Sequence, residues 1–203
     1  MFKRLASEAL GLSDIGVIVA PSDYDKVDAD DYLFHEDGEK IFFLIKSKKD
    51  EYCFTNLAVI HVDGDSAVSS KRSIRRYDFA THRVSDVLIE TAGTIDLDVE
   101  LKFTIQGAPD FSIDVRKSFL EQLKDIYKAL HTIGKLQDRN SLAQQNVLPC
   151  LDALGAMHKI AEVESEATLV KHYQAVLHAV NTMQLERYVK RDFSDVFEKY
   201  IKA

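Results

Sequence analysis

The sequence predicts an α+β protein: seven strands form an antiparallel barrel, a C-terminal helix caps the barrel, and an α-helical hairpin follows. Three observations carry this prediction. Residues 84–107 have the pattern of a long antiparallel strand pair. After residue 117 the spacing of the apolar residues changes from that of strands to that of a helix. Two further helical segments then follow, with apolar stripes that a small barrel cannot cover.

The strongest strand signal lies at residues 97–105. Apolar residues occupy every second position there, from Leu97 to Ile105, and polar residues fill the positions between them. Side chains of a strand alternate between two faces, so the segment predicts one buried face and one solvated face. Residues 84–91 predict the partner strand, and Gly93 predicts the turn because glycine adopts a positive φ at little cost.

Five other segments have strand character, and they complete the predicted barrel. Residues 41–45 are apolar throughout, which predicts burial on both faces or a cover over the outer face. Residues 71–79 are mostly polar and predict an edge strand. The remaining predicted strands are residues 52–56, 57–62 and 111–115.

The chain before these strands predicts a short amphipathic helix at residues 2–12 and an irregular acidic segment at residues 20–31. The acidic segment does not fit a calcium loop. Counted from Asp23, Val27 and Phe34 fall at positions where such a loop requires oxygen ligands. We therefore expect a solvated loop or a helix start.

The capping helix begins after the last strand. Ser118 and Glu121 fit a capping box, in which a serine at the helix start is followed three residues later by a glutamate. Gly134 predicts the point at which this helix ends or loosens. The apolar stripe, at intervals of 4, 3, 4 and 3 residues, consists of Phe119, Leu123, Ile126, Leu130 and Ile133.

The sequence divides into a barrel domain at residues 1–135 and a helical hairpin at residues 136–203. The hairpin helices, predicted at 138–163 and 166–191, are each about 37 Å long at 1.5 Å per residue. Pro149 is expected at a helix start or a kink, and a short helix is expected from Ser194. Because these apolar stripes exceed what the barrel can bury, they predict association with other copies of the chain. The predicted association residues are Leu154, Met157, Leu169, Tyr173, Val176, Leu177, Val180 and Met183.

Several runs resemble the motifs of bacterial pleckstrin-homology (PH) domains. Residues 90–101, Glu-Thr-Ala-Gly-Thr-Ile-Asp-Leu-Asp-Val-Glu-Leu, resemble the signature of that family, and residues 54–64 resemble its second motif. Residues 10–16 and 31–41 resemble the YvbH-like subgroup, in which a C-terminal helical oligomerisation region follows the PH domain. The resemblance implies a PH-like barrel and a homo-oligomer. It implies no common ligand or cofactor.

Composition limits the class of function. The chain has 203 residues, of which 46% are hydrophobic and 29% charged, as in soluble globular proteins. Residues 1–117 contain 15 Lys or Arg and 22 Asp or Glu, and this negative balance argues against nucleic acid and membrane partners. Without a signal peptide or paired cysteine spacing, Cys53 and Cys150 predict reduced thiols in a cytoplasmic protein.

The sequence contains no Gly-rich phosphate loop, nucleophile elbow or zinc-protease motif, so we expect no enzyme activity, metal or cofactor. It predicts a scaffold that associates through its C-terminal helices and presents barrel surfaces to another, unidentified protein. The alternative is binding to anionic lipid through two basic clusters, the first of which is opposed by Asp50 and Glu51. The predicted lipid contacts are Lys46, Lys48, Lys49, Lys71, Arg72, Arg75 and Arg76.

Overall fold

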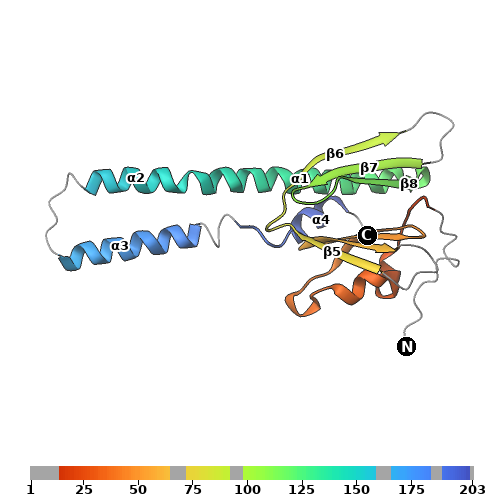
Figure 1. The fold of residues 1–203 in the computed structure, drawn as a ribbon, viewed down its shortest axis with the longest axis horizontal. Coiled ribbons are helices and arrows are strands. Elements are labelled where there is room, and N and C mark those ends of the chain that lie inside the picture. The colour runs from red at the N-terminus through yellow and green to blue at the C-terminus, as the bar shows by residue number, and fades with distance from the viewer. Residues whose placement is uncertain (1–13, 65–71, 92–97, 159–165, 184–188, 202–203) are drawn as a thin grey trace. The chain divides into compact units, whose positions relative to one another are not determined.

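The computed structural model describes residues 14–64, 72–91, 98–158, 166–183 and 189–201 (Figure 1). The chain divides into two compact units. The first unit contains residues 1–134 and 191–203, and the second contains residues 135–190. The helix predicted at residues 2–12 lies outside the described part of the chain.

The first unit contains two antiparallel sheets (Figure 1). One has the strand order β1-β2-β3-β4-β5, and the other has the order β6-β7-β8. A parallel bridge links Gly16 to Val115 of β8, with hydrogen bonds of 2.7 and 3.0 Å that connect Gly16 to the residues on either side of Val115. The strands are β1 (Val17–Ile18), β2 (Ile41–Lys46), β3 (Asp50–Thr55), β4 (Ala58–Gly64), β5 (Arg72–Asp78), β6 (Val84–Thr91), β7 (Asp98–Ile105) and β8 (Phe111–Arg116).

The predicted closed barrel of seven strands is corrected: the described residues form eight strands in two sheets. The seven predicted strands are all present, and their ends differ from the predicted ends by a few residues at most. The additional strand, β1, consists of Val17 and Ile18 alone. Two residues are too few to show the alternation from which a strand is recognised in a sequence.

Strand β7 shows the alternating burial that its sequence predicts. The polar residues on its other face are half-exposed. The predicted turn at Gly93 and the residue Leu97 lie outside the described residues. The buried residues of β7 are Val99, Leu101, Phe103 and Ile105.

Three short 3-10 helices between β1 and β2 cover one face of the five-stranded sheet. They are η1 (Pro21–Lys26), η2 (Asp28–Tyr32) and η3 (His35–Asp37). Val27, Ala29 and Leu33 form a buried cluster with apolar residues of β2, β3 and β4. The prediction that residues 41–45 are buried on both faces, or covered on the outer face, is confirmed for Phe43, Leu44 and Ile45, whereas Ile41 and Phe42 are half-buried. Of the two alternatives for residues 20–31, the helix start is confirmed, because η1 and η2 begin in this segment; the segment is not a fully solvated loop, since Val27 and Ala29 are buried.

Helix α1 (Leu120–Gln145) supplies the predicted stripe of the capping helix. Leu123, Ile126, Leu130 and Ile133 are completely buried. The prediction that Gly134 ends or loosens this helix is wrong, since the helix continues to Gln145. A Cβ atom at Gly134 would lie 2.5 Å from the carbonyl oxygen of Val84, so glycine permits a close approach between the helix and β6.

The second unit contains the end of α1, together with α2 (Val147–His158) and α3 (Glu166–Asn181). Of the helix predicted at residues 138–163, residues 138–145 belong to α1 and residues 159–163 lie outside the described part of the chain. Helix α3 ends at Asn181, before the predicted end at residue 191. Pro149 lies in the first turn of α2, where its missing N–H breaks no helical hydrogen bond. The connection at residues 159–165 lies outside the described residues, so the hairpin turn stays a prediction. The predicted last helix is confirmed as α4 (Ser194–Tyr200).

Candidate functional site

Helix α3 exposes large apolar side chains along one stripe. Residues three and four positions apart share a helix face, so these side chains form a continuous strip. Val176 and Val180 of the same stripe are half-buried. The exposed fractions are 50% for Leu169, 48% for Val170, 66% for Tyr173, 46% for Leu177 and 38% for Met183, which follows the helix.

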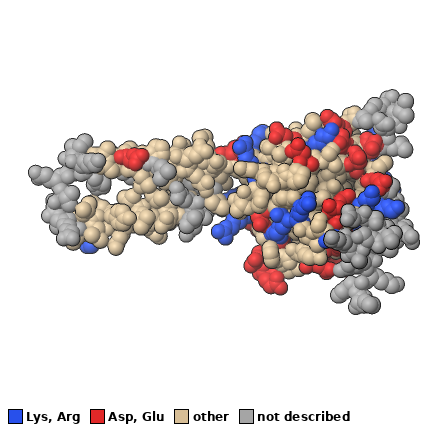
Figure 2. All heavy atoms as spheres, in the orientation of Figure 1, with Lys and Arg blue, Asp and Glu red and all other residues tan. Residues whose placement is uncertain are grey.

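Helices α2 and α3 also carry little charge. Within their bounds the sequence contains three charged residues, Asp152, Glu166 and Lys171. Figure 2 shows, on the face in view, charged side chains of both signs over the first unit and few on these two helices. Leu154 and Met157, the predicted association residues of α2, have side chains outside the described set. An exposed surface that is both apolar and poor in charge is typical of an association surface.

Helix α4 returns to the first unit after the two helices of the second. Phe193 and Phe197 are fully buried. The ring of Phe197 stacks on Phe42 with centroids 5.1 Å apart, and the ring of Phe193 meets Phe79 edge-on at 5.5 Å. The predicted 136–203 domain therefore includes a final segment that packs as part of the sheet unit.

Polar contacts hold the same segment. The side-chain amide of Asn56 donates a hydrogen bond to the carboxylate of Asp192 at 3.0 Å. The backbone N–H of Phe193 donates to the backbone carbonyl oxygen of Asn56 at 2.9 Å. Burial acts to raise the pKa of Asp192, but hydrogen bonds from Ser194 and Asn56 outweigh it and leave the pKa below its usual value. Asp192 thus docks as a charged acceptor.

Two family models match this chain, one over the sheets and their capping helix and the other over the C-terminal helices. Residues 9–133 match the family model described as "Bacterial PH domain". The chain belongs to the bacterial PH domain family. Residues 158–203 match a second model, described as "YvbH-like oligomerisation region". Both matches confirm the resemblance seen in the sequence.

Two relatives of this PH-domain protein from Bacillus subtilis differ in how much of its length they share. The protein YvbH of Bacillus subtilis (strain 168) is 50% identical over 203 residues, which cover 99% of each chain. YjqA of the same organism is 33% identical over 99 residues, or 48% of this chain and 76% of YjqA. The crystal structure of a PH domain-containing protein from Exiguobacterium sibiricum 255-15 has 41% identity and a TM-score of 0.80, and it covers 93% of this chain and 100% of its own.

The first predicted basic cluster contains one buried lysine, Lys46, and two exposed lysines, Lys48 and Lys49. Lys46 is buried and forms an ion pair with the buried carboxylate of Glu51. Glu51 also accepts hydrogen bonds from the backbone N–H groups of Asp28, at 3.3 Å, and Ala29, at 2.9 Å. Lys46 and Glu51 therefore fix η2 to the sheet, whereas Lys48 and Lys49 are exposed.

The second predicted cluster is largely paired as well. Arg76 forms hydrogen bonds of 3.0 and 2.9 Å with the buried carboxylate of Glu39 and one of 2.7 Å with Asp78. Arg72 pairs with Asp28. Arg75 is exposed, and Lys71 lies outside the described residues. Lipid binding stays a prediction, and within the described chain its unpaired predicted contacts are Lys48, Lys49 and Arg75.

Sequence reasoning missed the buried carboxylates of Glu39 and Glu51. Glu39 accepts hydrogen bonds from the Thr55 hydroxyl, at 2.5 Å, and from the backbone N–H of Phe34, at 2.8 Å. One feature of the sequence could have predicted the burial of Glu51. Glu51 is two residues from Cys53 in a predicted strand, so the two side chains lie on the same face. Burial, followed by the negative charge of Glu51 and Glu39, raises the pKa of the Cys53 thiol.

The described chain holds no group of three or more His, Cys, Asp or Glu side chains arranged to bind a metal ion. None of its described helices has the length and apolar character needed to cross a bilayer.

Proposed function

We propose that this protein is a homo-oligomeric scaffold. The helices of the second unit associate with those of other copies, and the sheet unit presents its surface to a protein partner. The exposed apolar stripe of α3 is the observation that carries the proposal. The match of residues 158–203 to an oligomerisation region supports it independently.

The stripe of α3 can supply a large part of the free energy of association. Completing the burial of one half-exposed Leu, Val, Tyr or Met is worth about 1 kcal/mol, because full burial contributes roughly 1.5–3 kcal/mol. Five such side chains from each of two copies would contribute about 10 kcal/mol, against an association cost of about 4–15 kcal/mol. We therefore expect side chains of α2 to share in the interface.

Association through a separate unit leaves the sheet unit free to bind. The sheet unit has its own core, in which both sheets, α1 and α4 contribute buried residues. Several sheet units held together can bind a multivalent partner far more tightly than one unit does, since later contacts form at a high effective concentration. The oligomer thus multiplies weak contacts with a protein partner.

The first test removes the second unit and keeps the rest. Residues 135–190 are replaced by a flexible Gly/Ser linker, while residues 191–203 are retained because Phe193 and Phe197 complete the sheet unit. Light scattering should give a multiple of 23.0 kDa for the full chain and a monomer for the shortened chain. An unchanged subunit number in the shortened chain would place association in the sheet unit and contradict the proposal.

The second test keeps the chain length constant. Tyr173→Asp combined with Leu177→Asp puts two charges into the exposed stripe, and we expect dissociation with the sheet signal in circular dichroism unchanged. The matched control, Ala175→Asp with His178→Asp, puts two carboxylates on exposed positions of the opposite helix face. The control should keep its subunit number. Equal dissociation in both variants would show that the effect is helix destabilisation.

A further inference from the structure

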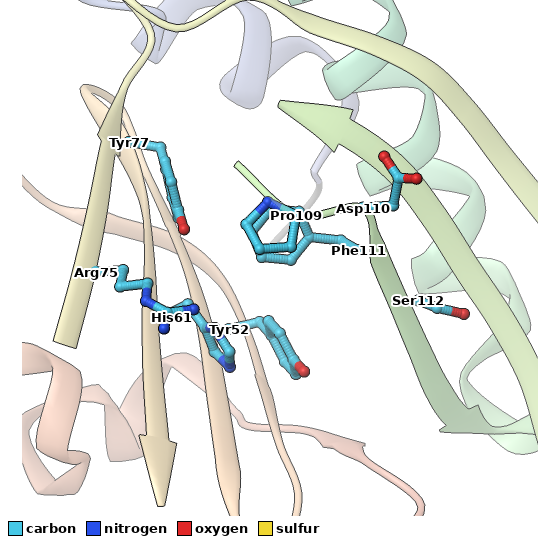
Figure 3. Close-up of a pocket in the computed structure, with 8 residues that line it drawn as sticks. All are labelled: Tyr52, His61, Arg75, Tyr77, Pro109, Asp110, Phe111 and Ser112. Carbon is cyan, nitrogen blue, oxygen red and sulfur yellow. The ribbon is translucent and has the colours of Figure 1, made fainter. Parts of the chain in front are cut away.

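A cavity of about 170 Å³ opens between the two sheets of the first unit (Figure 3). Tyr52, His61 and Arg75 are successive cross-strand partners on β3, β4 and β5, so their side chains line one wall. Tyr77 adds to this wall two residues beyond Arg75 on β5. The opposite wall comes from residues 109–112, at the start of β8.

The cavity has aromatic walls. The rings of Tyr52 and His61 stack with centroids 4.5 Å apart and an angle of 7° between their planes. Phe111 meets Tyr52 edge-on at 6.3 Å and Tyr77 at 5.7 Å. A cavity of about 150 Å³ holds one benzene molecule. This cavity is therefore of the size and lining to accept a single aromatic ring.

One charged side chain on the wall is available to a ligand. Figure 3 shows that the side chains of Asp110 and Ser112 point away from the cavity. The hydroxyl of Ser112 donates to Glu100, and Asp110 accepts from Thr104 at 3.2 Å. The Arg75 guanidinium, by contrast, forms no ion pair with any residue in the described ranges, although its side chain is exposed at the cavity.

We propose that this cavity binds an aromatic carboxylate, with the ring packed against the aromatic side chains that line the cavity and the carboxylate paired with Arg75. A planar guanidinium matches a carboxylate with two parallel hydrogen bonds. The ligand is either a free aromatic acid or the carboxyl-terminal aromatic residue of a polypeptide. This proposal does not depend on the oligomer.

The hydroxyl of Tyr52 adds a hydrogen-bond donor beside the ring. Burial, followed by the charges of Asp50, Asp63 and Asp114, raises the pKa of Tyr52, so the hydroxyl keeps its proton at neutral pH. Asp50 is itself occupied by His61, with 3.1 Å between the carboxylate oxygen and Nε2. These neighbouring carboxylates repel an anion, so the binding of a carboxylate depends on Arg75.

The test compares three planar ligands of one shape: benzoate, neutral benzamide and cationic benzamidine. Each is titrated into the full chain while the aromatic and arginine side-chain resonances are followed by NMR. We expect saturable chemical-shift changes at Tyr52, Tyr77 and Phe111. Benzoate should bind about tenfold or more tightly than benzamide, because only benzoate forms a hydrogen bond between opposite charges with Arg75. Arg75→Gln should remove this preference. Lys48→Gln removes the same charge from an exposed loop and should preserve the preference.

Three results would overturn the proposal. They are the absence of saturable shifts at the lining residues, tighter binding of benzamidine than of benzoate, and unchanged benzoate binding in Arg75→Gln. A fourth ligand, N-acetyl-phenylalanine, distinguishes the two sources. Tighter binding of this compound than of benzoate supports a polypeptide end, and the reverse order supports a free aromatic acid.

Discussion

Helices α1 and α3 carry apolar residues at the same helical spacing, and the two stripes differ in burial. In α1, Leu123, Ile126 and Leu130 have exposed fractions of 0%. In α3, Leu169 and Tyr173 have exposed fractions of 50% and 66%. Helical periodicity therefore predicts that a face will be covered, but it does not predict whether the cover comes from the same chain.

The difference follows from what each unit offers. In the first unit, the sheets bury the stripe of α1, and Gly134 permits close contact with Val84. The second unit, residues 135–190, contains no strand in its described part that could cover α3. The exposed stripe of α3 is thus available for the association that we propose.

The largest expected effect is a difference in reactivity between the two cysteine thiols, one in each unit. Cys53 is buried in the sheet unit and Cys150 is exposed on α2. A thiol reagent should modify Cys150 at least about a thousandfold faster, because Cys53 reacts only after opening of a core worth about 5–15 kcal/mol. The rates should be measured by mass spectrometry in the Tyr173→Asp, Leu177→Asp chain, so that no second copy covers Cys150. Similar rates would mean that the sheet unit lacks a fixed core.

The next prediction tests the assignment of α4 to the sheet unit. Phe197→Ala should lower the free energy of unfolding by about 3–5 kcal/mol, because it empties a fully buried site between Phe42 and Phe79. Urea unfolding followed by circular dichroism measures the change. Phe34→Ala is the control, since Phe34 is 51% exposed and its removal should cost less than about 1 kcal/mol. A loss of association with unchanged stability in Phe197→Ala would assign α4 to the associating helices instead.

A matched pair of leucines compares the two stripes directly. Leu130→Ala should destabilise the sheet unit by about 2–5 kcal/mol, whereas Leu177→Ala should change its stability by no more than about 0.5 kcal/mol. Leu177→Ala should instead raise the protein concentration at which the oligomer dissociates. Urea unfolding and light scattering at several concentrations separate the two effects. Equal destabilisation by both substitutions would contradict the distinction between the stripes.

The regular parts of the fold could be predicted from the sequence. Strand β7 and the stripe of α1 each repeat one spacing of apolar residues over many positions. Such a long repeat identifies both the type of element and the residues that face the core. Strand β1 has two residues and no period. The prediction at Gly134 was wrong because glycine can have two roles in a helix. Its backbone freedom favours a helix end, but here its missing side chain permits close packing against Val84.

The candidate site could be predicted less completely. The stripe of α3 was predicted because it is a periodic pattern. The roles of Lys46 and Arg76 were not, because their partners Glu51 and Glu39 are buried by a segment without regular pattern. The cavity beside Arg75 was also missed, since it depends on side chains from four strands, which single-sequence patterns do not place together.

The smallest expected effect concerns the pH dependence of the docking of α4 on the sheet unit. The pKa of Asp192 is lowered in the folded chain, so its contribution to stability is present above the unfolded value of about 3.9 and is lost as pH falls further. The protection factor of the Phe193 amide, which donates to the carbonyl oxygen of Asn56, should therefore fall between pH 5 and pH 3, once the slower intrinsic exchange at low pH is taken into account. Asp192→Asn should abolish this fall in protection, because an amide side chain does not titrate.

Glu198→Gln provides the control on the same helix. Glu198 is exposed and pairs with Lys40 at 3.1 Å, and exposed ion pairs contribute little to stability. The fall in protection at Phe193 should therefore persist in Glu198→Gln. If Glu198→Gln abolishes this fall and Asp192→Asn leaves it intact, the ion pair of Glu198 holds α4 in place, and the partly buried hydrogen bond between Asp192 and Asn56 does not.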